Sequence, residues 1–171
     1  MEQDKGSPAN QLVPELEALL NLWRSRYAAC PLPKHSLLSE RDLEPWSRNL
    51  AWIDHMPDDR FIVRKFGLDL IRRFGRESTG HAIDELAKDI AAGLREALWH
   101  AIVTGAPVVS YPSVQLGDAA ATFSELVLPL SAESTHVTAV LLASYEKALT
   151  QTRPARQSRS RRARRGLERP G

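Results

Sequence analysis

One long amphipathic helix between two groups of strand-like segments is the feature that most constrains the fold of this chain. Its apolar residues recur at helical spacing from Ile83 to Ala101, and Gly105-Ala106-Pro107 then ends the pattern. We therefore expect a helix over residues 84–104. Trp99 points away from the apolar stripe, so we expect it to face solvent unless the N-terminal helix or a second subunit covers it.

Strand patterns lie on both sides of this helix. Two short apolar segments enclose the turn Pro57-Asp58-Asp59 and predict a hairpin: Leu50–Asp54 and Phe61–Phe66. Residues 68–82 predict short helical turns, and three strand candidates follow the long helix: Val108–Val114, Thr122–Leu130 and Val137–Tyr145. This order predicts an α+β fold over residues 46–149, with a five-stranded antiparallel sheet and helices on one of its faces.

A second amphipathic pattern lies in an N-terminal flank, residues 1–45. Its apolar residues form one helical stripe: Leu12, Leu16, Leu19, Leu20, Trp23 and Tyr27. Pro14 suits the first turn of this helix, and Cys30-Pro31-Leu32-Pro33 ends it. We expect a short second helix over Ser39–Trp46, with Ser39 as its N-cap. The stripe packs either on the chain's own sheet or on a second copy in a dimer.

The overall charge of +2 conceals two segments of opposite sign. Residues 150–171 contain eight arginines and Glu168, a net charge of +7, so residues 1–149 carry −5. With almost no apolar side chains, this tail is expected to be disordered. As an alternative function, it predicts a nucleic-acid-associated protein or a contact with an acidic partner, through Arg159, Arg161, Arg162, Arg164 and Arg165.

Several classes of protein are excluded by composition. The chain has one cysteine, which rules out an internal disulfide framework and any cysteine-rich metal site. Its N-terminus is polar and resembles no signal peptide. The uncharged segment 97–117 is interrupted by Gly105, Pro107 and Pro112, so it does not predict a membrane span. We expect a cytoplasmic protein that does not bind membranes.

Several short sequence motifs, taken together with their order along the chain, suggest a protein family. They are Leu22-Trp23, Leu32-Pro33, Phe61–Gly67 with Arg64, Phe74–Gly80 with Gly75, Thr79 and Gly80, and Leu128-Pro129-Leu130-Ser131. Over residues 19–148 the chain thereby resembles the PAS superfamily, and more closely a single-domain bacterial family found mainly in alphaproteobacteria. The family motif residues are Arg64, Gly67, Gly75, Thr79, Gly80 and Pro129.

This resemblance implies a sensory or regulatory module without enzymatic activity. Such modules signal by binding other proteins or by forming homodimers, and some bind a small ligand between sheet and helices. The candidate pocket residues here are Trp52, Phe61, Phe66, Phe74, His100, Tyr111 and Phe123. The same aromatic residues could instead fill a closed core, which is the interpretation we favour. An enzyme on a similar α+β scaffold, such as an isomerase-like fold, would need a sizeable pocket with a perturbed polar group.

No cofactor, metal ligand or catalytic residue is predicted. The histidines show no metal-binding spacing, and haem ligation through His100 or His81 is a minor alternative suggested by the family. Cys30 lies outside the domain, so the reactive cysteine of flavin photosensors has no counterpart.

A basic cluster spans residues 60–76: Arg60, Arg64, Lys65, Arg72, Arg73 and Arg76. It predicts either an anion site or, as we favour, a solvated face balanced by carboxylates of residues 84–96.

Overall fold

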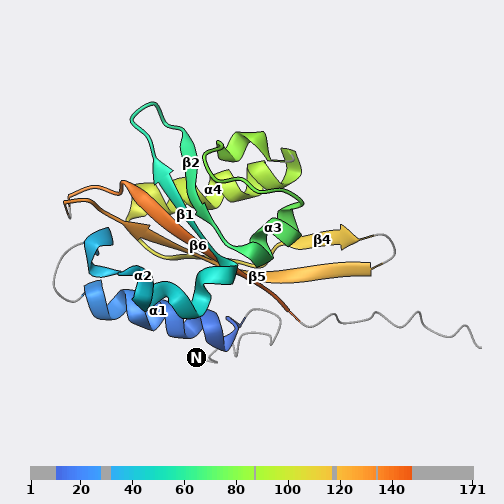
Figure 1. Ribbon diagram of the computed structural model, residues 1–171, viewed down its shortest axis with the longest axis horizontal. Helices are drawn as coiled ribbons and strands as arrows, with labels where there is room; N and C mark the ends of the chain where they lie inside the picture. The colour runs from blue at the N-terminus through green and yellow to red at the C-terminus, as the bar shows by residue number, and fades with distance from the viewer. Residues whose placement is uncertain (1–10, 28–31, 87, 117–118, 134, 148–171) are drawn as a thin grey trace, which may run out of the picture.

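A computed structural model describes residues 11–27, 32–86, 88–116, 119–133 and 135–147. Its centre is an antiparallel sheet with the strand order β2-β1-β6-β5-β3, and β4 pairs with the remaining length of β5 (Figure 1). The strands are β1 (Leu50–His55), β2 (Phe61–Phe66), β3 (Val108–Ser110), β4 (Ser113–Leu116), β5 (Ala119–Leu130) and β6 (Ala139–Glu146). The predicted α+β class is therefore confirmed.

Within the described residues the sheet has six strands, where the sequence pattern predicted five. The difference arises at Pro112, which has no backbone N–H to donate and divides the expected strand 108–114 into β3 and β4. Its carbonyl oxygen still accepts a hydrogen bond from Phe123 N at 2.9 Å. β5 is twelve residues long and pairs with both pieces. Its residues 125–127 pair with Val108–Ser110, and its residues 119–122 pair with Ser113–Leu116.

The helices are α1 (Pro14–Tyr27), α2 (Glu40–Leu43), α3 (Leu68–Phe74) and α4 (Lys88–Thr104), with 3-10 turns at His35–Leu37, Glu44–Asn49 and Ile83–Glu85. Ser39 caps α2 as predicted, because its hydroxyl accepts from Asp42 N and the Asp42 carboxylate accepts from Ser39 N. The long helix begins at Lys88 rather than residue 84, since Ile83–Glu85 form a separate turn followed by extended Leu86.

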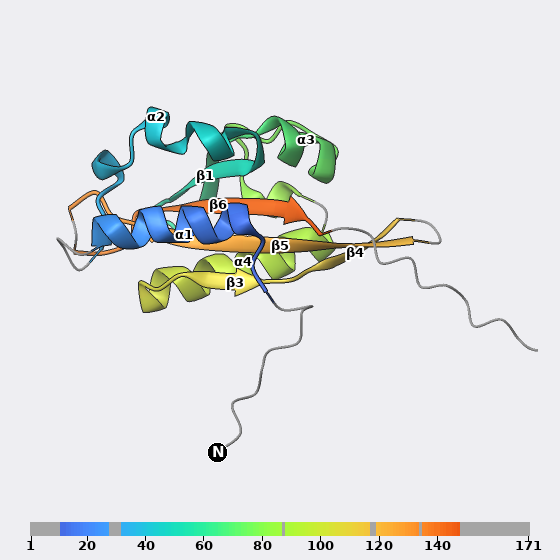
Figure 2. The same cartoon turned by 90° about the horizontal axis from the view of Figure 1, so that it is seen from below.

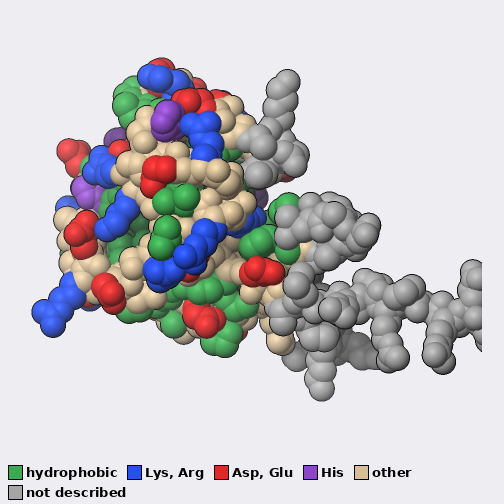
Figure 3. Space-filling model, turned by 45° about the vertical axis from the view of Figure 1, so that its right-hand side comes forward, with side chains coloured by type: hydrophobic (Ala, Val, Ile, Leu, Met, Phe, Trp, Pro, Cys, Tyr) green, Lys and Arg blue, Asp and Glu red, His purple; other side chains and the backbone are tan. Residues whose placement is uncertain are grey.

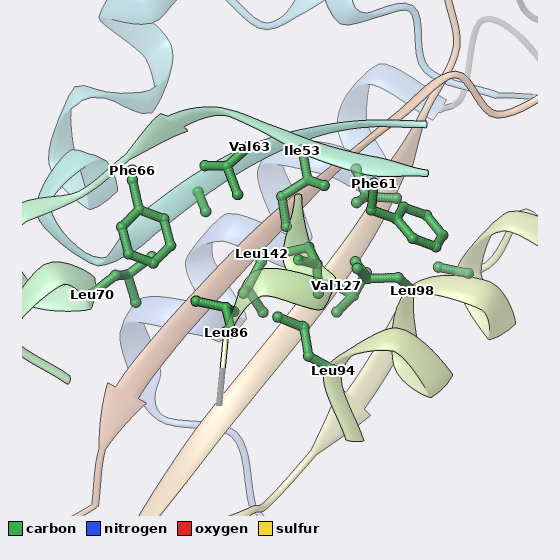
Figure 4. Packing of buried hydrophobic residues seen from close by; sticks show 14 of the residues in the cluster. Ile53, Phe61, Val63, Phe66, Leu70, Leu86, Leu94, Leu98, Val127 and Leu142 are labelled. Carbon is green, nitrogen blue, oxygen red and sulfur yellow. The ribbon is translucent and has the colours of Figure 1, made fainter. Parts of the chain in front are cut away.

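Helices cover both faces of the sheet (Figure 2). α3 and α4 lie on the face that we call the inner face, as predicted for the sheet domain. There Leu70, Leu94 and Leu98 meet Ile53, Val63, Val127 and Leu142 of the strands (Figure 4). α1 and α2 lie on the opposite, outer face, where a second core includes Leu126, Leu128 and Leu141. β6 is therefore buried on both sides, which explains its nearly continuous apolar sequence.

The stripe of α1 packs within the chain. Leu16, Leu19 and Leu20 are buried in the outer core, and Trp23 donates its indole N–H to Pro129 O at 2.9 Å. Of the two arrangements expected for this stripe, the structure shows packing on the chain's own sheet. The side chain of Tyr27, Cys30 and the predicted tail 150–171 lie outside the described residues. Within the described ranges, the helices are all too short or too polar to cross a bilayer.

Trp99 is not solvent-facing, although the helical pattern predicted that it would be. Its ring makes edge contacts with Phe61 at 5.5 Å and with His55 at 5.4 Å between centroids. The β1–β2 hairpin extends over this part of α4, so a neighbouring element of the same chain covers the indole.

Candidate ligand site at the α3 end of the sheet

A row of polar side chains crosses three neighbouring strands on the inner face. Ser110 of β3 pairs directly with Glu125 of β5, and Glu125 pairs directly with Ser144 of β6. Directly paired residues of antiparallel strands point to the same face, so the three side chains are adjacent. Ser110 Oγ donates to Glu125 Oε2 at 3.1 Å, and Asn49 Nδ2, just before β1, donates to Ser144 O at 3.1 Å.

Arg73 of α3 completes this row with a buried ion pair. Its Nη1 lies 2.5 Å from Glu125 Oε1 and also donates to Ser144 Oγ. The two charged side chains are only 10% and 9% exposed. The guanidinium carbon lies 3.8 Å from the ring centre of Phe123 and 4.9 Å from that of Phe74. Removing two charges from water is unfavourable, and the hydrogen bonds and aromatic faces around them offset this penalty.

The sequence of α3 places Arg73 over the sheet. Leu70 is buried in the inner core, and Arg73 follows three residues later on the same helical face. Gly75 ends the helix with a φ of 76°, and its N–H bonds Ile71 O at 2.8 Å. One helical turn before Arg73, the two oxygens of Asp69 accept hydrogen bonds from Arg48 Nε and Nη2 at 3.1 and 2.9 Å. These hydrogen bonds hold the pKa of the Asp69 carboxyl below its ordinary value.

A cavity of about 420 Å³ opens between α3 and the ends of β4, β5 and β6. We call it the α3-end cavity. Its helical wall includes Asp69, Leu70, Arg72 and Arg73, and its sheet wall includes Val114, Phe123, Ser144 and Glu146. The cavity thus combines apolar surface, hydrogen-bonding groups and charges of both signs in one concave site, which is typical of small-molecule sites.

A second hollow of about 390 Å³ lies on the outer face between α2 and the β1–β2 hairpin. Leu43, Leu50 and Trp52 contribute apolar surface, and Arg64 and Lys65 form part of its wall. A hollow of about 260 Å³ adjoins it and also includes Trp52 and Arg64. The cations here are already in ion pairs: Arg64 contacts Asp54 at 2.7 Å and Lys65 contacts Glu40 at 3.3 Å.

The predicted pocket aromatics do not surround one cavity. Phe123 lines the α3-end cavity, whereas Phe61 and Phe66 are buried in the inner core and Phe74 packs against Phe66. Trp52 lies at the outer hollow. Tyr111 has Lys147 Nζ over its ring at 4.2 Å. The inner core between α4 and the central strands is occupied by aliphatic side chains and Phe61 (Figure 4).

Neither histidine considered as a haem ligand lies in a cavity described above. His100 is on the exposed side of α4, and His81 is half exposed with Nδ1 at 2.9 Å from Glu85 Oε2. The structure therefore does not place His100 among pocket residues. In the described part of the chain, no three histidine, cysteine or acidic side chains gather as a metal site.

The family motif residues have structural contacts. Gly67 lies against the backbone of Ser47 and Arg48, Gly75 ends α3, and Gly80 N donates to Val63 O at 2.7 Å. Thr79 hydrogen-bonds the Glu77 carboxylate through its N–H and its hydroxyl, at 2.9 and 2.7 Å. Arg64 pairs with Asp54, and Pro129 accepts the Trp23 bond. These contacts stabilise the β1–β2 hairpin, the ends of α3 and the position in which α1 packs on the sheet.

Each cation of the basic cluster lies beside a carboxylate. The pairs are Arg60–Asp58, Arg64–Asp54, Lys65–Glu40, Arg72–Asp69, Arg73–Glu125 and Arg76–Glu85. The partners come from several elements, not only from the segment 84–96 as expected. On the face drawn in Figure 3, basic and acidic side chains are intermingled. The tail arginines proposed to bind nucleic acid lie outside the described residues.

Glu125, Ser110, Ser144 and Asn49 were not identified as site residues from the sequence. One signal was present, because Glu125 is the one charged residue of the mostly apolar segment 119–130, and a buried charge needs a partner. Arg73 was seen only as a member of the basic cluster. The pairing of the two required the register of β5 and the position of α3.

Comparison with known proteins supports the fold. No family model matches the sequence, and no curated protein matches it. Among solved structures, the PAS domain of BvgS from Bordetella pertussis superposes with a TM-score of 0.50 at 12% identity, covering 61% of this chain and 80% of that domain. The chain has a PAS fold. Because the identity is so low, this likeness concerns fold alone.

Two further PAS-type structures are similar over comparable lengths. A sensory box sensor histidine kinase from Vibrio cholerae has a TM-score of 0.46 at 19% identity, covering 78% of this chain and 98% of that one. A LOV protein from Rhodobacter sphaeroides has a TM-score of 0.44 at 14% identity, covering 64% of this chain and 69% of that one.

Proposed function

We propose that this chain is a non-enzymatic PAS-type sensory or regulatory module that holds a small ligand in the α3-end cavity and signals through another protein. The observation that carries this proposal is the buried Arg73–Glu125 pair beside that cavity, on the same face of the sheet as α3 and α4. A buried charge pair is weak evidence for stability alone, so we explain it by the site beside it, where it holds α3 against the sheet and frames the cavity.

The arrangement offers a route from ligand to structure. α3 has only seven residues and is tied to the 3-10 turn Glu44–Asn49 by Arg48–Asp69 and to β5 by Arg73–Glu125. A ligand bound between α3 and the sheet can favour one position of α3. The population of molecules with α3 in that position then increases. A partner that contacts α3 or the nearby strand ends would then sense occupancy.

The absence of catalysis is part of the proposal. Hydrogen bonds lower the pKa of Asp42, Asp58, Asp69, Glu77 and Glu85. A general acid at neutral pH needs a carboxyl whose pKa is raised, so none of these five groups suits that role.

We also propose that the signalling partner is a protein and that the chain forms a homodimer, as its PAS-type sequence features indicate. The stripe Leu16, Leu19, Leu20 and Trp23 is already buried within the chain, so the contact uses other surfaces. Light scattering of the purified protein measures this directly. A monomeric mass at all concentrations would contradict the homodimer.

Hydrogen–deuterium exchange tests the proposed sensory role. The protein is compared with and without a small-molecule extract of the cells that produce it. We expect slower exchange in α3 and in the adjoining ends of β5 and β6, with little change in α1 on the outer face. Unchanged exchange in all of these segments would contradict the proposed function.

A further inference from the structure

We infer that the α3-end cavity binds a small zwitterion, a molecule with one ammonium group, one carboxylate and an apolar part, such as an α-amino acid. This inference rests on the proposed function, because it names the chemical class of the ligand in the same cavity. It follows from which charged groups around the cavity are exposed and retain hydrogen-bonding capacity for a ligand.

Three charged groups at or beside the cavity already have ion-pair partners: Arg73, Glu125 and Asp69. Arg73 Nη1 contacts Glu125 and Ser144, although the buried Arg73 Nε has no hydrogen-bond partner among the described residues, and Asp69 accepts from both Arg48 and Arg72. Further binding to these groups would require breaking contacts that hold α3 in place. They form the frame of the cavity rather than its recognition groups.

Two groups of opposite charge remain available. Glu146, at the end of β6, is exposed and has no ion-pair partner among the described residues. Arg72, on the helical wall, is 68% exposed and has one contact, from Nη1 to Asp69 Oδ1 at 3.2 Å. A guanidinium carries five N–H donors, so Arg72 retains donors for a ligand carboxylate. A ligand ammonium correspondingly suits Glu146.

The two available charges lie on different walls of the cavity, whose lining also includes apolar side chains. Arg72 belongs to α3, whereas Glu146 is the direct cross-strand partner of Phe123 in the sheet. Leu70, Val114 and Phe123 supply the apolar part of the lining. The volume of about 420 Å³ lies within the range of roughly 300–1,000 Å³ that is usual for small-molecule pockets.

A ligand with a single charge fits this site less well. A simple carboxylate would find Arg72 but would lie in the field of Glu146 and Asp69, without an ammonium to compensate them. A simple amine would find Glu146 but would lie near Arg72 and Arg73. Only a molecule that carries both an ammonium group and a carboxylate can pair with Glu146 and Arg72 at the same time.

Isothermal titration calorimetry with the twenty standard L-amino acids tests this inference. We expect at least one to bind the full-length protein at concentrations up to about 10 mM. The tightest binder is then compared with its carboxylic acid lacking the amino group and with its amine lacking the carboxylate. Each analogue should bind at least about tenfold more weakly, because each loses one charge-assisted hydrogen bond.

Two charge-neutralising variants locate the binding. Arg72→Gln and Glu146→Gln should each weaken binding of the tightest amino acid at least about tenfold. Arg24→Gln on α1 and Glu133→Gln in an exposed turn make the same chemical changes away from the cavity, and they should leave affinity unchanged. Melting temperatures of all four variants verify that each is folded.

The results separate this inference from the proposed function. The inference is overturned if no amino acid binds, if the carboxylic acid or amine analogue binds as tightly as the zwitterion, or if Arg72→Gln and Glu146→Gln behave like their controls. The proposed sensory role fails separately, when the cell extract leaves the exchange of α3, β5 and β6 unchanged. If a ligand of another class slows the exchange of α3, only the inference that the ligand is a zwitterion is overturned.

Discussion

Two tryptophans donate the same kind of hydrogen bond, one at a buried position and one near the surface, so the contributions of the two bonds to stability should differ. Trp23 donates its indole N–H to Pro129 O at a buried position, and Trp46 donates to Glu15 O near the surface. Trp23→Phe leaves a buried carbonyl oxygen unsatisfied and should reduce the free energy of unfolding by about 1–3 kcal/mol. Trp46→Phe should reduce it less, because water can replace the lost donor. Urea denaturation measures both, and equal losses would contradict this account.

Gly67 and Gly93 form a second matched pair. A Cβ at Gly67 would collide with the carbonyl oxygens of Ser47 and Arg48, whereas a Cβ at Gly93 in α4 would meet open space. Gly67→Ala should therefore destabilise the protein by about 2 kcal/mol or more, through displacement of the backbone. Gly93→Ala should stabilise it by about 0.5–1 kcal/mol, because alanine favours helix. A neutral effect at Gly67, seen by thermal unfolding, would refute the close packing.

Asp69 makes stability depend on pH. Its pKa is lowered by the hydrogen bonds from Arg48, so its contribution is complete above the unfolded pKa and is lost as pH falls through the folded pKa. Asp69→Asn should lower the melting temperature near neutral pH, and its difference from wild type should shrink below about pH 4. Calorimetry across this range checks the sign, with Glu133→Gln as the control. A difference that grows on acidification would contradict it.

Most elements could be predicted from local patterns. The stripe of α1, the Ser39 cap and the β1–β2 hairpin each depend on residues close in sequence, and they occur where expected. The start of α4 was misplaced, because the 3-10 turn Ile83–Glu85 has the same apolar spacing as a helix start. The strand 108–114 was predicted whole because the effect of Pro112 depends on how β5 pairs.

Removing α1 tests the role of the N-terminal flank. α1 covers Leu126, Leu128 and Leu141 on the outer face, so deletion of residues 1–28 exposes an apolar sheet surface. We expect a lower melting temperature together with self-association. Light scattering and calorimetry provide the two readings. A monomer with the melting temperature of the full chain would show that α1 contributes little to the outer core.

At the scale of the whole molecule, the sheet separates two cores, and the candidate site lies where the inner core ends. Phe123 was predicted as a pocket residue from its aromatic character alone. The polar row Ser110–Glu125–Ser144 could not be predicted, because its members are far apart in sequence and a register shift of one residue would place Glu125 on the other face. Long-range register, rather than local pattern, creates this site.

The central claim is that a small molecule occupies the α3-end cavity. Val114 lines this cavity from β4, whereas Val109 of β3 does not, so Val114→Trp fills the cavity and Val109→Trp is its control. Native mass spectrometry after incubation with the cell extract measures occupancy directly. We predict an added small-molecule mass on wild type and Val109→Trp, and none on Val114→Trp. An added mass that persists on Val114→Trp, or is absent from wild type, would contradict the claim.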